Sequence, residues 1–162
     1  MTIRCKTKFL VLIGSIIFLD QATKFIITAS LNLYDRVEVI KGFFQVIYVR
    51  NSGAIWGILS DHPNAWVQKL ITILSVAALG IVLYYFLRLP SRCLPELISL
   101  SFIMGGAVGN IIDRLFQGYV VDFLDFYIKD LHWPTFNVAD SFISIGVVIL
   151  IFSIWRGKCT SI

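Results

Sequence analysis

Four long apolar runs divide this chain and leave little sequence between them. They occupy residues 9–29, 66–87, 97–112 and 138–155, and each is near the roughly 20 residues that a helix needs to cross a bilayer. Of the 162 residues, 57% are hydrophobic and only 15% are charged, which is unlike a soluble domain. The pattern predicts a polytopic α-helical membrane protein with four transmembrane helices in a single domain, residues 1–162.

Basic residues favour one side of the predicted bundle. An even number of spans places both termini and the connection between the second and third spans on the same side. The basic residues of that side are Arg4, Lys6, Lys8, Arg88, Arg92, Arg156 and Lys158. The positive-inside rule then predicts cytoplasmic termini. We therefore interpret the net charge of +4 as membrane orientation and expect no nucleic-acid partner.

This orientation has consequences for the N-terminus and the cysteines. The first apolar run resembles a signal peptide, but it continues directly into Asp20 without a small-residue cleavage site, so we expect a retained span. Cys5, Cys93 and Cys159 all fall on the cytoplasmic side. Because that compartment is reducing, we expect no disulfide.

Two segments between the spans have their own character. Residues 37–49 are rich in β-branched and aromatic side chains and predict a β-hairpin that turns near residue 42 and lies on the outer membrane surface. Residues 123–133 are aromatic and mixed in charge, and predict an interfacial flap helix over the same surface. Asp125 and the other loop acids are expected to be solvated, and His132 has no ligand-spaced partner.

Asp122 and Asp140 bracket the segment that leads into the last span. An ionisable group at membrane depth is costly and indicates a functional site. Other polar residues also lie within or beside apolar runs: Asp20, Asn51, Asn110, Asp113, Arg114 and Asn137. The topology brings all eight to the extracytoplasmic side at a similar depth, and scattered structural residues would not segregate in this way.

Taken singly, several of these residues also have a purely structural explanation. Asp140 is at a position where it can cap a helix, and Asp20 can pair with Lys24 one turn away. Asn110 can bond between helices. Gly105 begins a small-residue spacing that is common where helices pack.

Two carboxylates in a poorly solvated pocket have a specific use. Their repulsion keeps one protonated and one ionised, so that they share a proton. The ionised group can activate water while the other donates a proton to the developing oxyanion and the leaving amine. Since the pair titrates together, neither role is assigned to one residue. Peptide hydrolysis at the membrane surface is the resulting hypothesis.

The chain also resembles the bacterial lipoprotein signal peptidases, the type II signal peptidases, over essentially its whole length. The matching blocks are Asp20-Gln-Ala-Thr-Lys24, Asn51-Ser-Gly-Ala-Ile-Trp-Gly57, Gly105-Gly-Ala-Val-Gly-Asn-Ile-Ile-Asp-Arg114, Val121-Asp-Phe-Leu-Asp125 and Phe136-Asn-Val-Ala-Asp140. Their order and their placement relative to four spans make the match specific. One departure is Ile55-Trp56, where family members often carry Ala-Phe, and it bears on lipid or inhibitor contact.

The resemblance implies an aspartyl endopeptidase of the bacterial inner membrane. Such an enzyme removes the signal peptide of diacylglyceryl-modified prolipoproteins by cleaving before the lipidated cysteine, needs no metal or organic cofactor, contacts membrane lipid, and is inhibited by globomycin. Asp122 and Asp140 would be the catalytic pair, and the hairpin would form a cradle for the substrate. The residues implied to bind substrate or support the site are Asp20, Lys24, Asn51, Gly53, Gly105, Asn110, Asp113, Arg114 and Asn137.

Two other classes of function compete with this interpretation. A small proton-coupled transporter would use Asp20, Asp122 and Asp140 as a relay, but it requires polar residues that continue toward the cytoplasm. The inner halves of the apolar runs offer few beyond serines. A non-catalytic membrane adaptor would make the acidic cluster incidental.

Overall fold

Four helices dominate the computed structural model, which describes residues 6–53, 65–157 and 159. The helices are α1 (Thr7–Ser30), α2 (Ala65–Arg88), α3 (Leu94–Phe116) and α4 (Val138–Trp155). Each is long and apolar enough to cross a membrane. The four spans predicted from the apolar runs are therefore confirmed, and α3 extends beyond its predicted range at both ends because its polar residues are covered by other elements.

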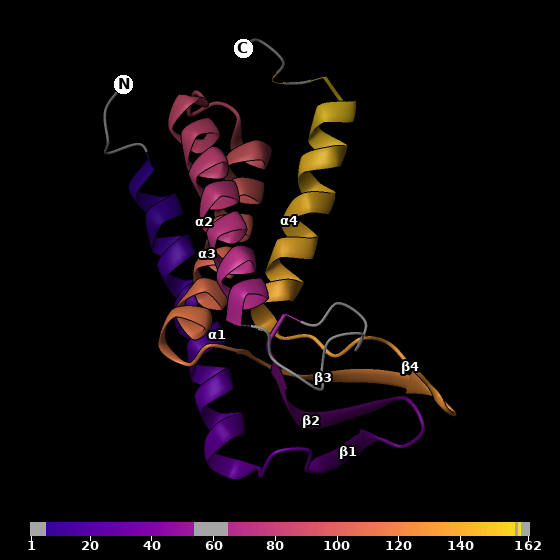
Figure 1. Cartoon of the computed structure of the whole chain (residues 1–162). Coiled ribbons are helices and arrows are strands. Elements are labelled where there is room, and N and C mark those ends of the chain that lie inside the picture. Colours follow the sequence, from indigo (N-terminus) through magenta and orange to yellow (C-terminus); the bar gives the residue numbers. More distant parts are fainter. Residues whose placement is uncertain (1–5, 54–64, 158, 160–162) are drawn as a thin grey trace.

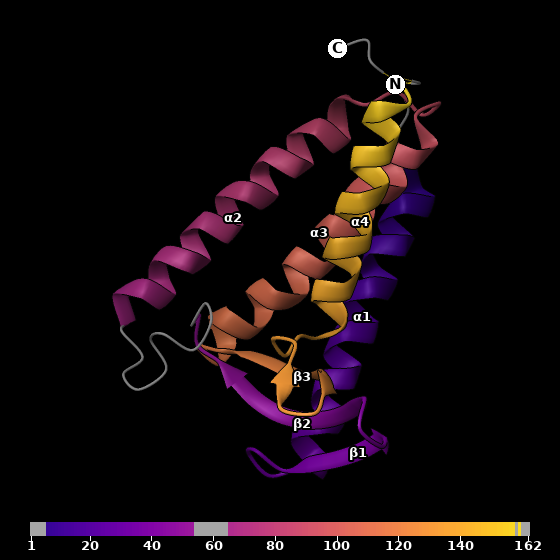
Figure 2. The same cartoon turned by 90° about the vertical axis from the view of Figure 1, so that its right-hand side faces the viewer.

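The helix α3 is the centre of the bundle, since it packs against α1, α2 and α4. A cluster of apolar side chains near the terminal end of the bundle, including Phe9, Phe86 and Leu97, joins α1, α2 and α3. Figure 2 shows α2 meeting the other helices near the chain termini and diverging from them toward the opposite end.

A four-stranded antiparallel sheet lies at the end of the bundle away from the termini (Figure 1). Its strands, in spatial order, are β1 (Arg36–Ile40), β2 (Phe44–Asn51), β3 (Val120–Ile128) and β4 (Leu131–His132). β1 and β2 form the predicted hairpin, which is confirmed. The buried side chains of Tyr48, Val121 and Phe123 pack against the ends of α1 and α4.

The predicted flap helix is wrong. Residues 123–133 lie within β3, the following turn and β4. The physical reason is a partner far away in the sequence: β3 pairs with β2 from Phe44 opposite Phe126 to Asn51 opposite Val120. The aromatic and β-branched residues that suggested an interfacial segment are also those that favour a strand.

The expectation of no disulfide is also wrong. Cys93 and Cys159 form one, with their Cα atoms 5.9 Å apart. It joins the connection between α2 and α3 to the segment after α4. The prediction rested on the compartment alone, whereas the fold brings together two segments that are 66 residues apart in the sequence. Cys5 lies outside the described residues.

Candidate active site

Asn137 connects Asp122 of β3 to Asp140 in the first turn of α4. Its side-chain Nδ2 donates a hydrogen bond of 2.7 Å to Asp122 Oδ1. Its Oδ1 accepts one of 2.9 Å from the backbone N–H of Asp140, and its own N–H donates to Asp140 Oδ2 at 3.3 Å. Asn137 is thus the N-cap of α4 in a reciprocal capping box and at the same time a direct partner of Asp122.

Asp122 is almost completely enclosed, with only 1% of its surface exposed. Its second oxygen accepts a hydrogen bond of 2.8 Å from the side-chain amide of Asn51. Burial, and then the negative charge of Asp140, raise the pKa of Asp122 from 3.8 to about 7 against the opposing effect of the bonds from Asn51 and Asn137. A carboxyl group in this environment binds a proton near neutral pH.

Asp140 is held from the other side by α3. Asn110 Nδ2 donates a hydrogen bond of 2.7 Å to Asp140 Oδ1. The Oδ1 atom of Asn110 accepts from Asn137 at 3.1 Å and from Lys24 Nζ at 3.0 Å. Asn110 therefore links the pair of acids to α1, and the predicted interhelical hydrogen bond is present.

Lys24 lies between two buried carboxylates. Its Nζ contacts Asp20 Oδ2 and Asp113 Oδ2, both at 2.8 Å, and both acids have no exposed side-chain surface. Asp20 also accepts from the backbone N–H of Ala139 at 3.0 Å, and Asp113 from that of Val121 at 3.2 Å. Buried charges persist only when they are paired and hydrogen-bonded, so this trio fixes α1, α3, β3 and α4 relative to one another.

Gln21 has a role in the site that was not predicted from the sequence. Its Nε2 donates to Asp113 Oδ1 at 2.9 Å and to the backbone carbonyl of Gly109 at 3.2 Å. It is thus a further bond between α1 and α3. The available signal was an uncharged amide beside Asp20 within an apolar run, where a polar side chain needs a partner.

The remaining predicted site residues have different positions. The backbone N–H of Gly53 donates to Asn51 Oδ1 at 2.9 Å, and its φ of +100° favours glycine. Gly105 instead faces α1: an added Cβ would lie 2.8 Å from Ile16, which supports its helix-packing explanation. Arg114 is half-buried and interacts electrostatically with Asp140, Asp122 and Asp113. Residues Ile55 and Trp56 lie outside the described residues.

Seven of the eight polar residues singled out from the sequence thus form one hydrogen-bonded network, with Lys24 and Gln21 as further members. Arg114 joins it electrostatically. The network draws on α1, β2, α3, β3 and α4, all at the sheet end of the bundle. Its chemistry is that of two adjacent carboxyl groups, one of them enclosed, beside a guanidinium group.

Comparisons with known proteins agree with this arrangement. The family model described as signal peptidase (SPase) II matches residues 12–156. A lipoprotein signal peptidase of Syntrophus aciditrophicus is 41% identical over 88% of this chain and 89% of its own, and one of Geobacter sulfurreducens is 43% identical over 86% of each chain. A bacterial membrane enzyme solved by the in meso method at 1.9 Å resolution has a TM-score of 0.80 at 34% identity, covering 91% of this chain and 92% of its own. The chain therefore belongs to the signal peptidase II family.

Proposed function

We propose that this protein is an aspartyl endopeptidase that removes the signal peptide from diacylglyceryl-modified prolipoproteins by cleaving before the lipidated cysteine. Family membership supports a peptidase of the signal peptidase II type. The observation that carries the aspartyl assignment is the shared contact of Asp122 and Asp140 with Asn137. It holds two carboxyl groups beside each other at the edge of the helical bundle.

The environment of Asp122 supports a shared proton. Its pKa of about 7 means that Asp122 carries a proton in a large fraction of molecules near neutral pH. The ionised carboxylate accepts a proton from the attacking water. The protonated carboxyl donates toward the carbonyl oxygen and then toward the leaving amine. The two groups act as one titrating pair, and no metal or organic cofactor takes part in these steps.

Arg114 is suited to position the substrate backbone. It lies within electrostatic range of both acids and is partly accessible. A guanidinium group can donate several hydrogen bonds to peptide carbonyls without accepting any. Asn51 and Asn110, by contrast, use their amides to hold the two acids and act as positioning residues.

The sheet is proposed to lie on the outer membrane surface as a cradle. Large apolar side chains of β1, including Val37, Val39 and Ile40, are exposed. A neighbouring cavity of about 560 Å³ is lined by Phe43, Phe126, Tyr127, Ile128, Leu131, His132, Trp133 and Phe136. Aromatic and apolar residues of this kind favour the membrane–water interface. A signal peptide and its lipid chains can reach such a site without leaving the membrane.

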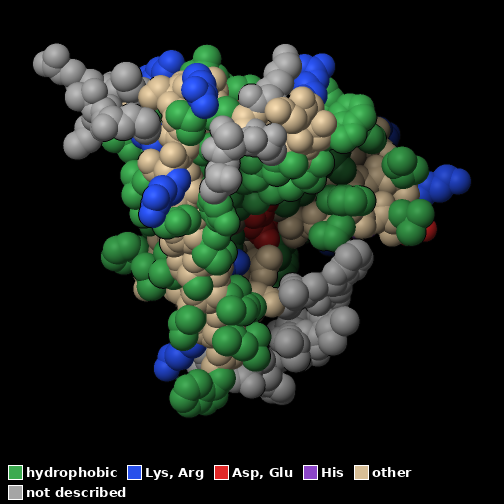
Figure 3. All heavy atoms as spheres, turned by 90° about the horizontal axis from the view of Figure 1, so that it is seen from above, with side chains coloured by type: hydrophobic (Ala, Val, Ile, Leu, Met, Phe, Trp, Pro, Cys, Tyr) green, Lys and Arg blue, Asp and Glu red, His purple; other side chains and the backbone are tan. Residues whose placement is uncertain are grey.

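The proposed orientation has both termini in the cytoplasm and the acids near the outer face of the bacterial inner membrane. Figure 3, seen from the end with the termini, has Lys and Arg side chains around the periphery of a largely hydrophobic surface. Arg88 and Arg156 end α2 and follow α4 at this end. Basic residues that flank the spans at this end support the cytoplasmic assignment.

The decisive experiment is a gel-shift assay of purified protein on a diacylglyceryl prolipoprotein, with and without globomycin. The wild-type protein is expected to release the signal peptide, and globomycin to prevent it. Asp122→Asn and Asp140→Asn are each expected to abolish turnover while the protein stays folded. Asp35→Asn is the matched control, because Asp35 is exposed and lies outside the network. Near-normal turnover by either folded active-site variant contradicts the aspartyl assignment.

The same assay separates the peptidase from a proton-coupled transporter. A transporter would leave the prolipoprotein intact and acidify or alkalinise the lumen of proteoliposomes in response to a solute gradient. The family assignment favours the peptidase, and we retain it as the function.

A further inference from the structure

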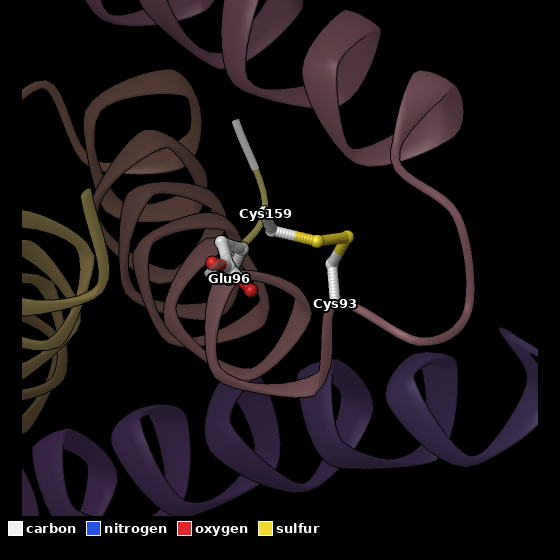
Figure 4. A group of neighbouring side chains, drawn as sticks. All are labelled: Cys93, Glu96 and Cys159. Carbon is white, nitrogen blue, oxygen red and sulfur yellow. A yellow bond between two sulfur atoms is a disulfide. The ribbon is translucent and has the colours of Figure 1, made fainter. Parts of the chain in front are cut away.

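A second group of chemically versatile side chains lies at the opposite end of the bundle from Asp122. It consists of Cys93, Glu96 and Cys159, whose sulfur and carboxylate atoms all lie within 4.8 Å of one another. Figure 4 shows the carboxylate of Glu96 beside the Cys93–Cys159 bridge at the start of α3. These residues take no part in the proposed peptide hydrolysis.

Glu96 is unusual because it is buried without being fully satisfied. Only 7% of its surface is exposed. Ser153 of α4 donates a hydrogen bond to Glu96 Oε1, but Oε2 is enclosed and has no hydrogen-bond partner among the described residues. A buried polar atom without a partner is costly and requires an explanation such as an ion or water. This unpartnered atom is a sign of a bound ligand that does not depend on the proximity of the two cysteines.

We propose that the reduced form of this group binds one thiophilic divalent cation, of the Zn²⁺ type, through the two thiolates and Glu96. Two sulfurs and one carboxylate oxygen are ligands that zinc accepts, with a water in the fourth position. Zn–S bonds of about 2.3 Å place two thiolates about 3.8 Å apart in a tetrahedral site. The Cα separation of 5.9 Å brings the two cysteines close enough for small side-chain rotations to reach this spacing.

The local structure suits an anionic ligand set. Cys93 is the N-cap of α3, and Glu96 lies in its first turn, where the partial positive charge of a helix N-terminus favours negative groups. The bond from Ser153 fixes the orientation of the carboxylate, as outer partners of metal ligands commonly do. Glu96, Ser153 and Cys159 also line a cavity of about 580 Å³ between α2, α3 and α4, which provides an entry path for an ion.

Disulfide and metal are alternative states of the same two sulfurs. A thiol reductant supplies two electrons and two protons, the S–S bond breaks, and two thiols form. Binding of the cation then displaces the two thiol protons and leaves both sulfurs as thiolate ligands. If this end of the bundle faces the cytoplasm, cellular thiols are the reductant class that favours the metal-binding state.

Co²⁺ is the probe for this proposal, because thiolate ligands give it a strong charge-transfer absorption. The full-length protein in detergent is reduced with a phosphine, freed of reductant without oxygen, and titrated with Co²⁺ and then Zn²⁺. The expected result is one Co²⁺ per chain, release of two protons, and displacement by Zn²⁺. The oxidised wild-type protein is expected to give no thiolate band, and this comparison needs no substitution.

Variants assign the ligands. Cys159→Ser is expected to remove the thiolate band, and Glu96→Gln to weaken binding by at least about tenfold. Asp130→Asn removes an exposed carboxylate of the turn after β3 and is the matched control, expected to bind as the wild type does. The proposal is overturned if the reduced protein gives no band, if oxidation does not change binding, or if Cys159→Ser binds like Asp130→Asn. None of these results depends on the proteolytic activity.

Discussion

The side-chain amide of Asn137 donates a 2.7 Å hydrogen bond to Asp122 while the same residue caps the helix that carries Asp140. Asn137→Ser separates the two roles, because serine also caps helices well but lacks the amide that reaches Asp122. We expect kcat/KM to fall by at least about tenfold, since a bond to a charged group contributes roughly 1.5–3 kcal/mol. The Asn137 bond lowers the pKa of Asp122, so the alkaline limb of the pH–rate profile should move to higher pH.

Asn32→Ser is the control for this substitution, because Asn32 is exposed and is distant in sequence from both acids. An unchanged rate and an unchanged pH profile would show that Asn137 acts only as a helix cap.

The raised pKa of Asp122 predicts a pH-dependent stability. The folded pKa of about 7 exceeds the reference value of 3.8, so the folded state binds a proton more tightly than the unfolded state does. This contribution to the free energy of unfolding is fully present below pH 4 and is lost as the pH rises toward 7 and beyond. Asp122→Asn removes the ionisation and should raise the Tm at pH 8. The gain in the free energy of unfolding at pH 8 is on the order of 4 kcal/mol at most, and little change is expected at pH 4.

Thermal unfolding in detergent at both pH values measures this effect, with Asp35→Asn as the exposed control. An equal change at pH 4 and pH 8 would mean that the substitution acts through packing and not through the proton.

The sequence allowed the four helices to be predicted because hydropathy is a local property. The site was predicted from the segregation of polar residues and from family motifs, but its bonds were not. Lys24 and Asn110 are 86 residues apart and Asn110 and Asp140 are 30 apart, so no local spacing relates them. The resemblance identified most members of the network. It did not predict that Lys24 lies between Asp20 and Asp113, or that Gln21 bonds α1 to α3.

The errors have a common physical origin in long-range partners. The segment after Val120 is a strand because β2 pairs with it, and its own composition did not decide between helix and strand. Cys93 and Cys159 are 66 residues apart. The redox state of a compartment does not show whether two such cysteines lie close together in the fold. Asp125 was expected to be solvated, but its position opposite Gln45 in the sheet buries it.

Lys24 is predicted to matter more for stability than either of its partners. Lys24→Met leaves Asp20 and Asp113 buried without a cation, which costs about 3–5 kcal/mol. Asp113→Asn leaves a balanced Lys24–Asp20 pair and should cost less, about 1–3 kcal/mol for weakened hydrogen bonds, with activity and Tm falling together. Thermal unfolding of both variants tests this order, and Lys41→Met at an exposed turn position is the control. A larger loss for Asp113→Asn would contradict the charge-balance argument.

Asp125 is predicted to hold the turn between β3 and β4 in place. It is buried and accepts a hydrogen bond of 2.6 Å from Gln45 Nε2, and it contacts His132 Nδ1 at 2.9 Å. Asp125→Ala leaves both partners unsatisfied, so residues 126–133 should exchange amide hydrogens about tenfold faster or more, as expected for a loss of roughly 1–3 kcal/mol. Asp130→Ala, at an exposed position of the same turn, should leave the exchange rates unchanged. Equal acceleration in both variants would mean that β2 pairing alone fixes this segment, and that the contact between His132 and Asp125 adds nothing to it.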